Sequence, residues 1–252
     1  DYLVIGHLTI DQTPAGPSLG GTAAYSALTA SALGLRVGVL TAWSGEMPLD
    51  ALGNIPVLAA ETEKATRFEN RYSPEGRTQY IRQAAAKIDF GLVPEPWRRT
   101  KIIHLGPVAQ EMQSVLPAEF RPTLLGLTPQ GWMRSWDQDG LIQPCAWPSA
   151  AQAMPAAGAT VFSIDDVDHD EEQIEWLAHQ GRLVVITEGA AGCRLFWNGD
   201  SRRFRAPLVD EVDATGAGDI FATAFFVRLA QTRDPWEAAR FASNLAAYSV
   251  TR

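Results

Sequence analysis

The chain has 252 residues, of which 46% are hydrophobic and 20% are charged. This composition excludes an intrinsically disordered protein and is sufficient for one large domain with a full core. The net charge of -8 and the lack of a basic stripe argue against nucleic acid as a partner. A negative chain that binds a negative ligand must place cations, helix N-termini or a metal at one focused site.

Several motif classes are missing from the sequence. No apolar run of about 18 residues and no leader-type start occurs, so we expect no membrane partner. Cys145 and Cys193 lie far apart and outside any C-x-x-C pattern, which is typical of free thiols in a cytoplasmic protein. A P-loop and zinc-ligand spacings are also missing. The lack of G-x-G-x-x-G after the first strand argues against a Rossmann-type oxidoreductase.

Strands and helices alternate from the start of the chain. Residues 2–6 are a short apolar run that predicts a buried strand, and residues 36–40 predict the next one. The Ala-rich stretch 22–33 between them predicts a helix with Thr22 as its N-cap. Residues 16–21 are expected to form a loop before this helix. The order strand, helix, strand predicts a parallel βαβ unit.

The same alternation continues along the rest of the sequence. Further strands are expected at 101–105, 118–127, 159–163 and 182–187, a hairpin at 193–205, and helices at 172–180, 217–231 and 235–249. No internal repeat is visible, which excludes solenoids and propellers. We therefore predict one three-layer α/β/α domain over residues 1–252, with a mostly parallel central sheet.

Residues 62–85 interrupt this pattern. Polar and aromatic residues alternate on both sides of the turn-forming stretch 73–76, which predicts a β-hairpin with one exposed face. A hairpin inserted into an α/β chain is a candidate lid or dimer flap. Its arginines either close over anionic groups or discourage strand aggregation as solvated edge charges.

The segment 213–219 reads D-A-T-G-A-G-D and opens directly into an apolar helix. The first-turn amides of such a helix have no intrahelical partners, and with the helix dipole they form an anion site. Gly216 and Gly218 let a phosphate approach the backbone closely. Asp219 at the mouth of this site makes sense as a base that takes a proton from a hydroxyl attacking phosphorus. A simple glycine-rich helix start with an acidic first turn is the alternative.

This segment resembles the D-T-x-G-A-G-D signature of the ribokinase-like (PfkB) carbohydrate kinases, with Ala214 in place of a Thr. The resemblance implies a ribokinase-like fold, with Asp219 as the catalytic base. It also implies that Gly216, Ala217 and Gly218 form the anion hole for the transferred phosphoryl group.

Residues near the start of the chain resemble the family's acceptor site. Gly20 and Gly21, followed by the Ala-rich helix, are similar to the family's first signature. Asp11 matches the acidic residue that binds substrate hydroxyls in the family, and a carboxylate accepts from two hydroxyls. Tyr25 stands where the family usually has Asn, which points away from a standard ribokinase acceptor site. A sugar, a cyclic polyol and a nucleoside all remain open as acceptors.

The donor side is implied by a second set of residues. The stretch 187–192 is similar to the family's T-x-G-x-x-G nucleotide loop, so Thr187, Gly189 and Gly192 are candidates for binding ATP. Asn244 on the last helix is a candidate for contacting adenine or ribose. Asp166 ends a degenerate form of the family's N-x-x-E and is a candidate for the Mg²⁺ site, with a solvated acidic loop as the alternative. K⁺ is a further candidate cofactor.

Three other residues are singled out by their positions. Trp132 lies in the stretch 130–134, which follows a strand and either borders the site or anchors packing. His104 in an apolar strand is expected to be a hydrogen-bonded core histidine, and His7 is expected near the acceptor.

Together the sequence predicts a cytoplasmic, ATP-dependent small-molecule kinase, acting as a monomer or as a homodimer through the lid. The alternative on the same fold is a catalytically weak sugar or nucleotide sensor.

Overall fold

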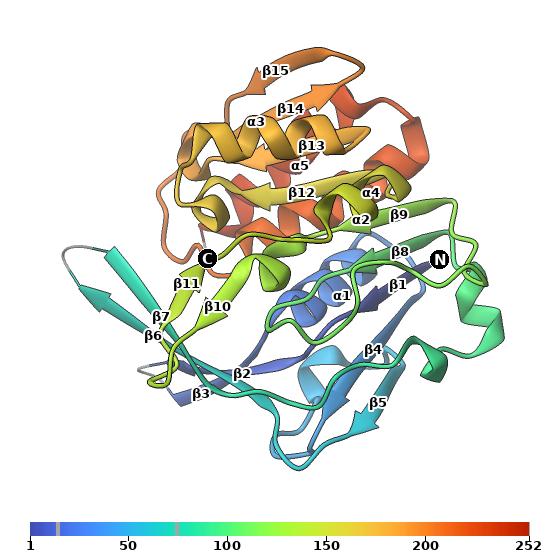
Figure 1. Cartoon of the computed structure of the whole chain (residues 1–252), viewed down its shortest axis with the longest axis vertical. Coiled ribbons are helices and arrows are strands. Elements are labelled where there is room, and N and C mark those ends of the chain that lie inside the picture. Colours follow the sequence, from blue (N-terminus) through green and yellow to red (C-terminus); the bar gives the residue numbers. More distant parts are fainter. Residues whose placement is uncertain (14–15, 74–75, 252) are drawn as a thin grey trace.

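The computed structural model describes residues 1–13, 16–73 and 76–251. Its centre is a nine-stranded sheet in the order β15-β14-β13-β12-β9-β8-β1-β4-β5 (Figure 1). The parallel strands are β1 (Tyr2–Ile5), β4 (Val37–Trp43), β5 (Val57–Glu61), β8 (Ile102–Leu105), β9 (Leu124–Leu127), β12 (Ala159–Ser163) and β13 (Leu183–Thr187). The antiparallel edge is made by β14 (Cys193–Trp197) and β15 (Asp200–Phe204).

Helices cover both faces of this sheet, which confirms the predicted three-layer α/β/α architecture. The longer helices are α1 (Thr22–Ala32), α3 (Glu171–Gln180), α4 (Ala217–Thr232) and α5 (Pro235–Ser249), and α2 (Ala150–Ala153) is a single turn. Short 3₁₀ helices occur at η1 (Asp50–Leu52), η2 (Phe90–Leu92), η3 (Glu95–Arg99), η4 (Pro129–Met133), η5 (Met154–Ala156), η6 (Ile164–Val167) and η7 (Gly189–Ala191). No described helix is long and apolar enough to cross a bilayer.

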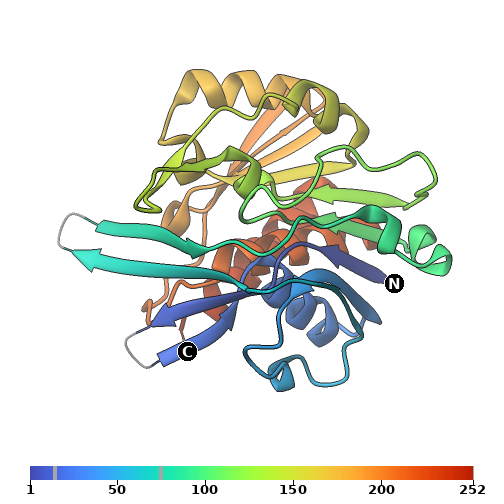
Figure 2. The ribbon, with the colours of Figure 1, turned by 60° about the horizontal axis from the view of Figure 1, so that its bottom comes forward.

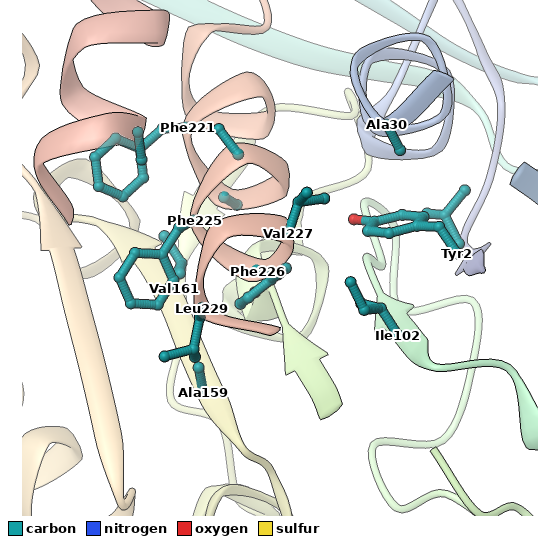
Figure 3. Packing of buried hydrophobic residues seen from close by; sticks show 14 of the residues in the cluster. Tyr2, Ala30, Ile102, Ala159, Val161, Phe221, Phe225, Phe226, Val227 and Leu229 are labelled. Atoms are coloured by element: carbon teal, nitrogen blue, oxygen red, sulfur yellow. The ribbon is translucent and has the colours of Figure 1, made fainter. Parts of the chain in front are cut away.

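The strand side chains alternate between two buried cores, because successive residues of a strand point to opposite faces. Tyr2 and Val4 pack with α1, α4 and α5, whereas Leu3 and Ile5 pack with α2 and α3 on the other face. Figure 3 shows the first core, in which α4 places a row of aromatic rings over the sheet. A Cβ on Gly126 of β9 would lie 2.7 Å from the Phe226 ring, so a glycine is required where α4 meets the sheet.

A second, four-stranded sheet projects from the side of the domain (Figure 2). Its order is β3-β2-β6-β7, formed by β2 (Thr9–Thr13), β3 (Gly16–Gly20), β6 (Thr66–Ser73) and β7 (Gly76–Gln83). We call this sheet the lid. The predicted hairpin is confirmed in β6 and β7, although its turn residues Pro74 and Glu75 lie outside the described residues.

The lid is larger than the predicted 62–85 hairpin. The loop expected at 16–21 is wrong, because residues 16–20 form the edge strand β3 that pairs with β2. Proline is tolerated on an edge strand, so Pro17 does not prevent this pairing. A further hairpin of β10 (Arg134–Trp136) and β11 (Ile142–Pro144) adjoins β7, where Ile81 N donates to Gly140 O at 2.8 Å. The lid is therefore tied to the main domain at several points.

Candidate active site

The glycine turn before α4 is stabilised by hydrogen bonds among its own residues. Gly216 is the N-cap of α4 with φ 76°, in the left-handed region that favours glycine. Asp213 Oδ1 accepts from Thr215 N at 2.8 Å, and Ala217 N donates to Ala214 O at 3.1 Å. The Ala217 amide is thus engaged inside the turn. The next first-turn amides, those of Gly218 and Asp219, are groups that a helix cannot satisfy internally, as an anion site requires.

Tyr25 packs against this turn. A Cβ on Gly216 would lie 2.4 Å from Tyr25 Cδ1, so the ring of Tyr25 lies directly on the Gly216 backbone. By contrast, a Cβ on Gly218 would meet no heavy atom of the described residues within 4 Å. One side of the turn is therefore covered by Tyr25 from α1, and the other side is open to a ligand.

Asp219 lies in the first turn of α4 and is half-buried. Protein atoms around its carboxyl group raise its pKa from 3.8 to about 6, chiefly through desolvation. A hydrogen bond from Thr22 and the positive charge of Arg134 oppose this rise, while the charges of Asp166 and Asp11 add to it. The carboxyl group is thus more basic than an ordinary Asp and still ionised at neutral pH.

Asp11 of the lid strand β2 lies near Asp219. On β2 it lies opposite Ser18 of β3 and Phe68 of β6, and its Oδ1 accepts from Thr9 Oγ1 at 2.8 Å. A Cβ on Gly20 would lie 2.1 Å from Asp11 Oδ2, so the glycine leaves room for the carboxylate. Because the charge of Asp11 raises the pKa of Asp219, the predicted acceptor carboxylate and the predicted base share one site.

Gly21 has φ 85° and is the N-cap of α1, so the prediction of Thr22 as N-cap is wrong. No side chain caps this helix, and Thr22 is buried with its hydroxyl on Asp219. The contact of Thr22 with the candidate base was not predicted from the sequence. The signal available was a polar residue at the start of an otherwise apolar helix, next to two glycines.

Asp166 is held in a capping box at the end of β12. Its Oδ2 accepts from Ser163 N at 2.9 Å, and its Oδ1 accepts from Gln130 Nε2 of η4 at 3.1 Å. Burial raises its pKa, against the effect of the Arg134 charge. Asp166 is therefore a fixed, half-buried carboxyl, unlike its exposed neighbour Asp165.

The predicted nucleotide loop, residues 187–192, begins beside Asp166, because Thr187 at the end of β13 pairs with Ser163 at the end of β12. Gly192 has φ 102°, and a Cβ there would lie 1.9 Å from Phe204 O, so only glycine fits. Gly189 also has a positive φ, and Glu188 N donates to Gly192 O at 2.7 Å to close the loop. Cys193 Sγ lies 3.8 Å from Ser243 Oγ, which brings the exposed Asn244 of α5 near the loop.

The structure settles the other three side chains of interest. His104 is a buried core histidine, as expected, between the Tyr2 hydroxyl and Thr128 Oγ1, both at 2.8 Å, and burial lowers its pKa to about 3. His7 is also buried and bonds to Thr66 Oγ1 at the start of β6 at 2.7 Å and to Ala86 O, after the end of β7, at 2.9 Å. Trp132 stacks on Trp147 and is a packing anchor.

Comparisons with known proteins bear on the fold and on the family likeness of the chain. The family model described as pfkB family carbohydrate kinase matches residues 149–252. Cytidine kinase of Thermococcus kodakarensis is 27% identical over 95% of this chain and 92% of its own length. Fructokinase of Rhizobium leguminosarum bv. trifolii is 27% identical over 90% of this chain and 79% of its own length.

Solved structures show the same fold over the full length. Ribokinase of Thermotoga maritima superimposes with a TM-score of 0.72 at 18% identity, over 100% of this chain and 93% of its own. A pyrophosphate-dependent kinase of the ribokinase family, complexed with a pyrophosphate analog and myo-inositol, gives a TM-score of 0.81 at 19% identity, covering 100% and 96%.

Residues 149–252 thus match the pfkB family of carbohydrate kinases, and the similarity to kinases in sequence and fold extends over nearly the whole chain. The structure brings Asp219, Asp11, Asp166 and Tyr25 around the start of α4. The residues of the predicted nucleotide loop follow the neighbouring strand β13. Parallel strands of an open sheet present ligand sites at their carboxyl ends, and Ser163 and Thr187 both end such strands.

Proposed function

We propose that the protein transfers the terminal phosphoryl group of ATP to a hydroxyl of a sugar, polyol or nucleoside. The supporting observation is the placement of Asp219. Its carboxyl group is desolvated, carries a raised pKa of about 6, and follows directly on the open turn at Gly218. A basic carboxylate beside unsatisfied helix amides suits proton removal from an alcohol that attacks phosphorus.

In the proposed reaction Asp219 takes the proton of the acceptor hydroxyl. The alcohol oxygen then forms a bond to the terminal phosphorus as the bridging P–O bond breaks, and ADP leaves with that electron pair. The amides of Gly218 and Asp219 stabilise charge on the transferred group, with Gly216 and Ala217 shaping their turn. Asp11 accepts hydrogen bonds from further acceptor hydroxyls and fixes the one that reacts.

Mg²⁺ is the metal that phosphoryl transfer from ATP calls for. Among the described residues no group of three or more Asp, Glu, His or Cys is arranged to hold a metal ion. This fits Mg²⁺, which keeps several waters and binds proteins through one or two carboxylates plus substrate phosphates. Asp166 is the residue that would hold it, since each of its oxygens has one hydrogen bond and a remaining lone pair. The ion would supply charge neutralisation.

ATP would occupy the loop of Thr187, Gly189 and Gly192, with Asn244 beside it on α5. Pyrophosphate is the second candidate donor, because pyrophosphate-dependent kinases are among the solved structures with the same fold, at TM-scores of 0.81 and 0.82. For the acceptor, the chain resembles both a cytidine kinase and fructokinases in sequence. The proposal therefore covers furanose sugars, cyclic polyols and nucleosides as one polyhydroxyl class.

A turnover screen tests this proposal. Product phosphate ester is measured for fructose, ribose, myo-inositol and cytidine, each with ATP or pyrophosphate, with and without MgCl₂. We expect turnover with at least one acceptor, lost in Asp219→Asn and retained in Asp210→Asn, which removes an exposed acidic residue of the same chain segment. Stabilisation by an acceptor and donor without any product would support a sensor and overturn the kinase proposal.

A further inference from the structure

Arg134 lies where three parts of the molecule meet. It is the first residue of β10 and follows η4 directly, and η4 holds Gln130 on Asp166. Met133 and Trp132 before it are buried, and its own backbone oxygen accepts a hydrogen bond from the Gln110 side chain. The backbone of Arg134 is therefore anchored beside the donor-side carboxyl.

The side chain of Arg134 reaches toward the lid and the two site carboxylates. Its guanidinium carbon lies 6.0 Å from the centre of the Phe68 ring. In the lid, Phe68 is the residue paired with Asp11, on the same face of the sheet. The positive charge of Arg134 lowers the pKa of Asp219 and of Asp166 alike. The guanidinium thus lies among the acceptor carboxylate, the base and the Asp166 carboxyl.

A cation at this position would stabilise the negative charge of the phosphoryl group during its transfer. A phosphoryl group carries its charge on equatorial oxygens, and here it must pass between Asp219 and Asp166. A guanidinium is planar, remains charged, and presents paired N–H donors that match phosphate oxygens. The half-buried setting of Arg134 strengthens that interaction relative to one at a solvated surface.

We propose that Arg134 contacts the transferring phosphoryl group and acts as a catalytic residue that stabilises its charge between donor and acceptor. This inference rests on the proposed kinase function and adds to it a residue outside the four signature stretches of the sequence. It also gives the lid a chemical role, because Phe68 packs against the guanidinium and limits its orientation.

Three variants test the inference. Arg134→Ala removes the guanidinium, Arg134→Lys keeps the charge without the planar fork, and Arg71→Ala is the matched control. Arg71 lies on the lid strand β6, on the opposite face from Phe68, and pairs with Glu69 at 2.6 Å. Removing a donor to transition-state charge lowers kcat by about 10²–10³-fold, which we expect for Arg134→Ala. Arg134→Lys should recover part of that loss, and added guanidinium chloride at non-denaturing concentration should restore turnover to Arg134→Ala.

A binding measurement keeps the inference separate from the proposed function. Inorganic pyrophosphate added with MgCl₂ should raise the thermal midpoint of the wild type and of Arg71→Ala, and this shift should be reduced in Arg134→Ala. The inference is overturned if Arg134→Ala keeps kcat within about threefold of the wild type, or loses activity that neither Lys nor guanidinium restores. If the wild type turns over no acceptor, the proposed function fails. If pyrophosphate then raises the thermal midpoint of Arg134→Ala as much as that of the wild type, the role of Arg134 is rejected as well.

Discussion

Replacing Asp219 with Asn should inactivate the protein and make it more stable. The carboxyl pKa rises from 3.8 to about 6 in the folded state, because folding removes water from the charged form. A shift of about two pKa units corresponds to roughly 3 kcal/mol at neutral pH. Asp219 is half-buried rather than sealed from solvent, so we expect about 1–2 kcal/mol to be recovered by the neutral amide. The amide oxygen of Asn can still accept from Thr22.

The pH dependence of this gain follows from proton linkage. The folded protein binds the Asp219 proton more tightly than the unfolded chain does, so the wild-type penalty is absent below about pH 3.8. The penalty grows between pH 3.8 and about 6, and is complete above pH 6. The difference in unfolding free energy between Asp219→Asn and wild type should therefore rise over the same interval and level off.

Urea unfolding followed by circular dichroism at pH 4, 5, 6 and 7.5 measures this difference. Turnover of Asp219→Asn should meanwhile be lower by about 10²–10⁴-fold, the usual scale for a positioned base. Asp210→Asn serves again as the control, with little change in either quantity. A stability gain of equal size at all four pH values would show that packing, and not desolvation of a charge, sets the energetics of this position.

Three further changes probe the surroundings of the base. Thr22→Val removes a hydrogen bond that lowers the Asp219 pKa, so the acidic limb of the kcat/KM profile should move above pH 6; an unmoved limb contradicts the contact. Gly216→Ala places a methyl group 2.4 Å from Tyr25 Cδ1 at a φ of 76°, so the unfolding free energy should fall, whereas Gly218→Ala, whose methyl group faces open space, should change it less; equal effects in urea unfolding would reject the packing of Tyr25 on this turn. Tyr2→Phe leaves His104 Nδ1 without its 2.8 Å partner and should cost about 1–3 kcal/mol of unfolding free energy in urea titration, and a neutral result would show another partner there.

The sequence is informative where the geometry is local. Residues 213–219 carry the turn, the helix start and the base within one short stretch, so their arrangement follows from backbone rules alone. Buried parallel strands such as β12 and β13 were found because they are continuous apolar runs. The three-layer architecture then follows from the alternation of strands and helices.

The remaining features depend on partners distant in sequence. Residues 16–20 form a strand only because β2 pairs with them, and their Gly and Pro content indicates a loop when it is read alone. Thr22 resembles an N-cap until α4 places Asp219 beside it. Arg134 becomes part of the site through Phe68 on the lid and Asp166 after β12, and no pattern along the chain relates these three positions.

The grouping of Asp11, Asp166 and Asp219 has a consequence for the order in which ligands arrive. Three carboxyl groups around one arginine create a local field that opposes any approaching anion. A neutral polyhydroxyl compound is not repelled by this field, and its hydroxyl groups can donate hydrogen bonds to the carboxylate oxygens. A bare polyphosphate is repelled, so the donor enters more readily once a divalent cation has already lowered its charge.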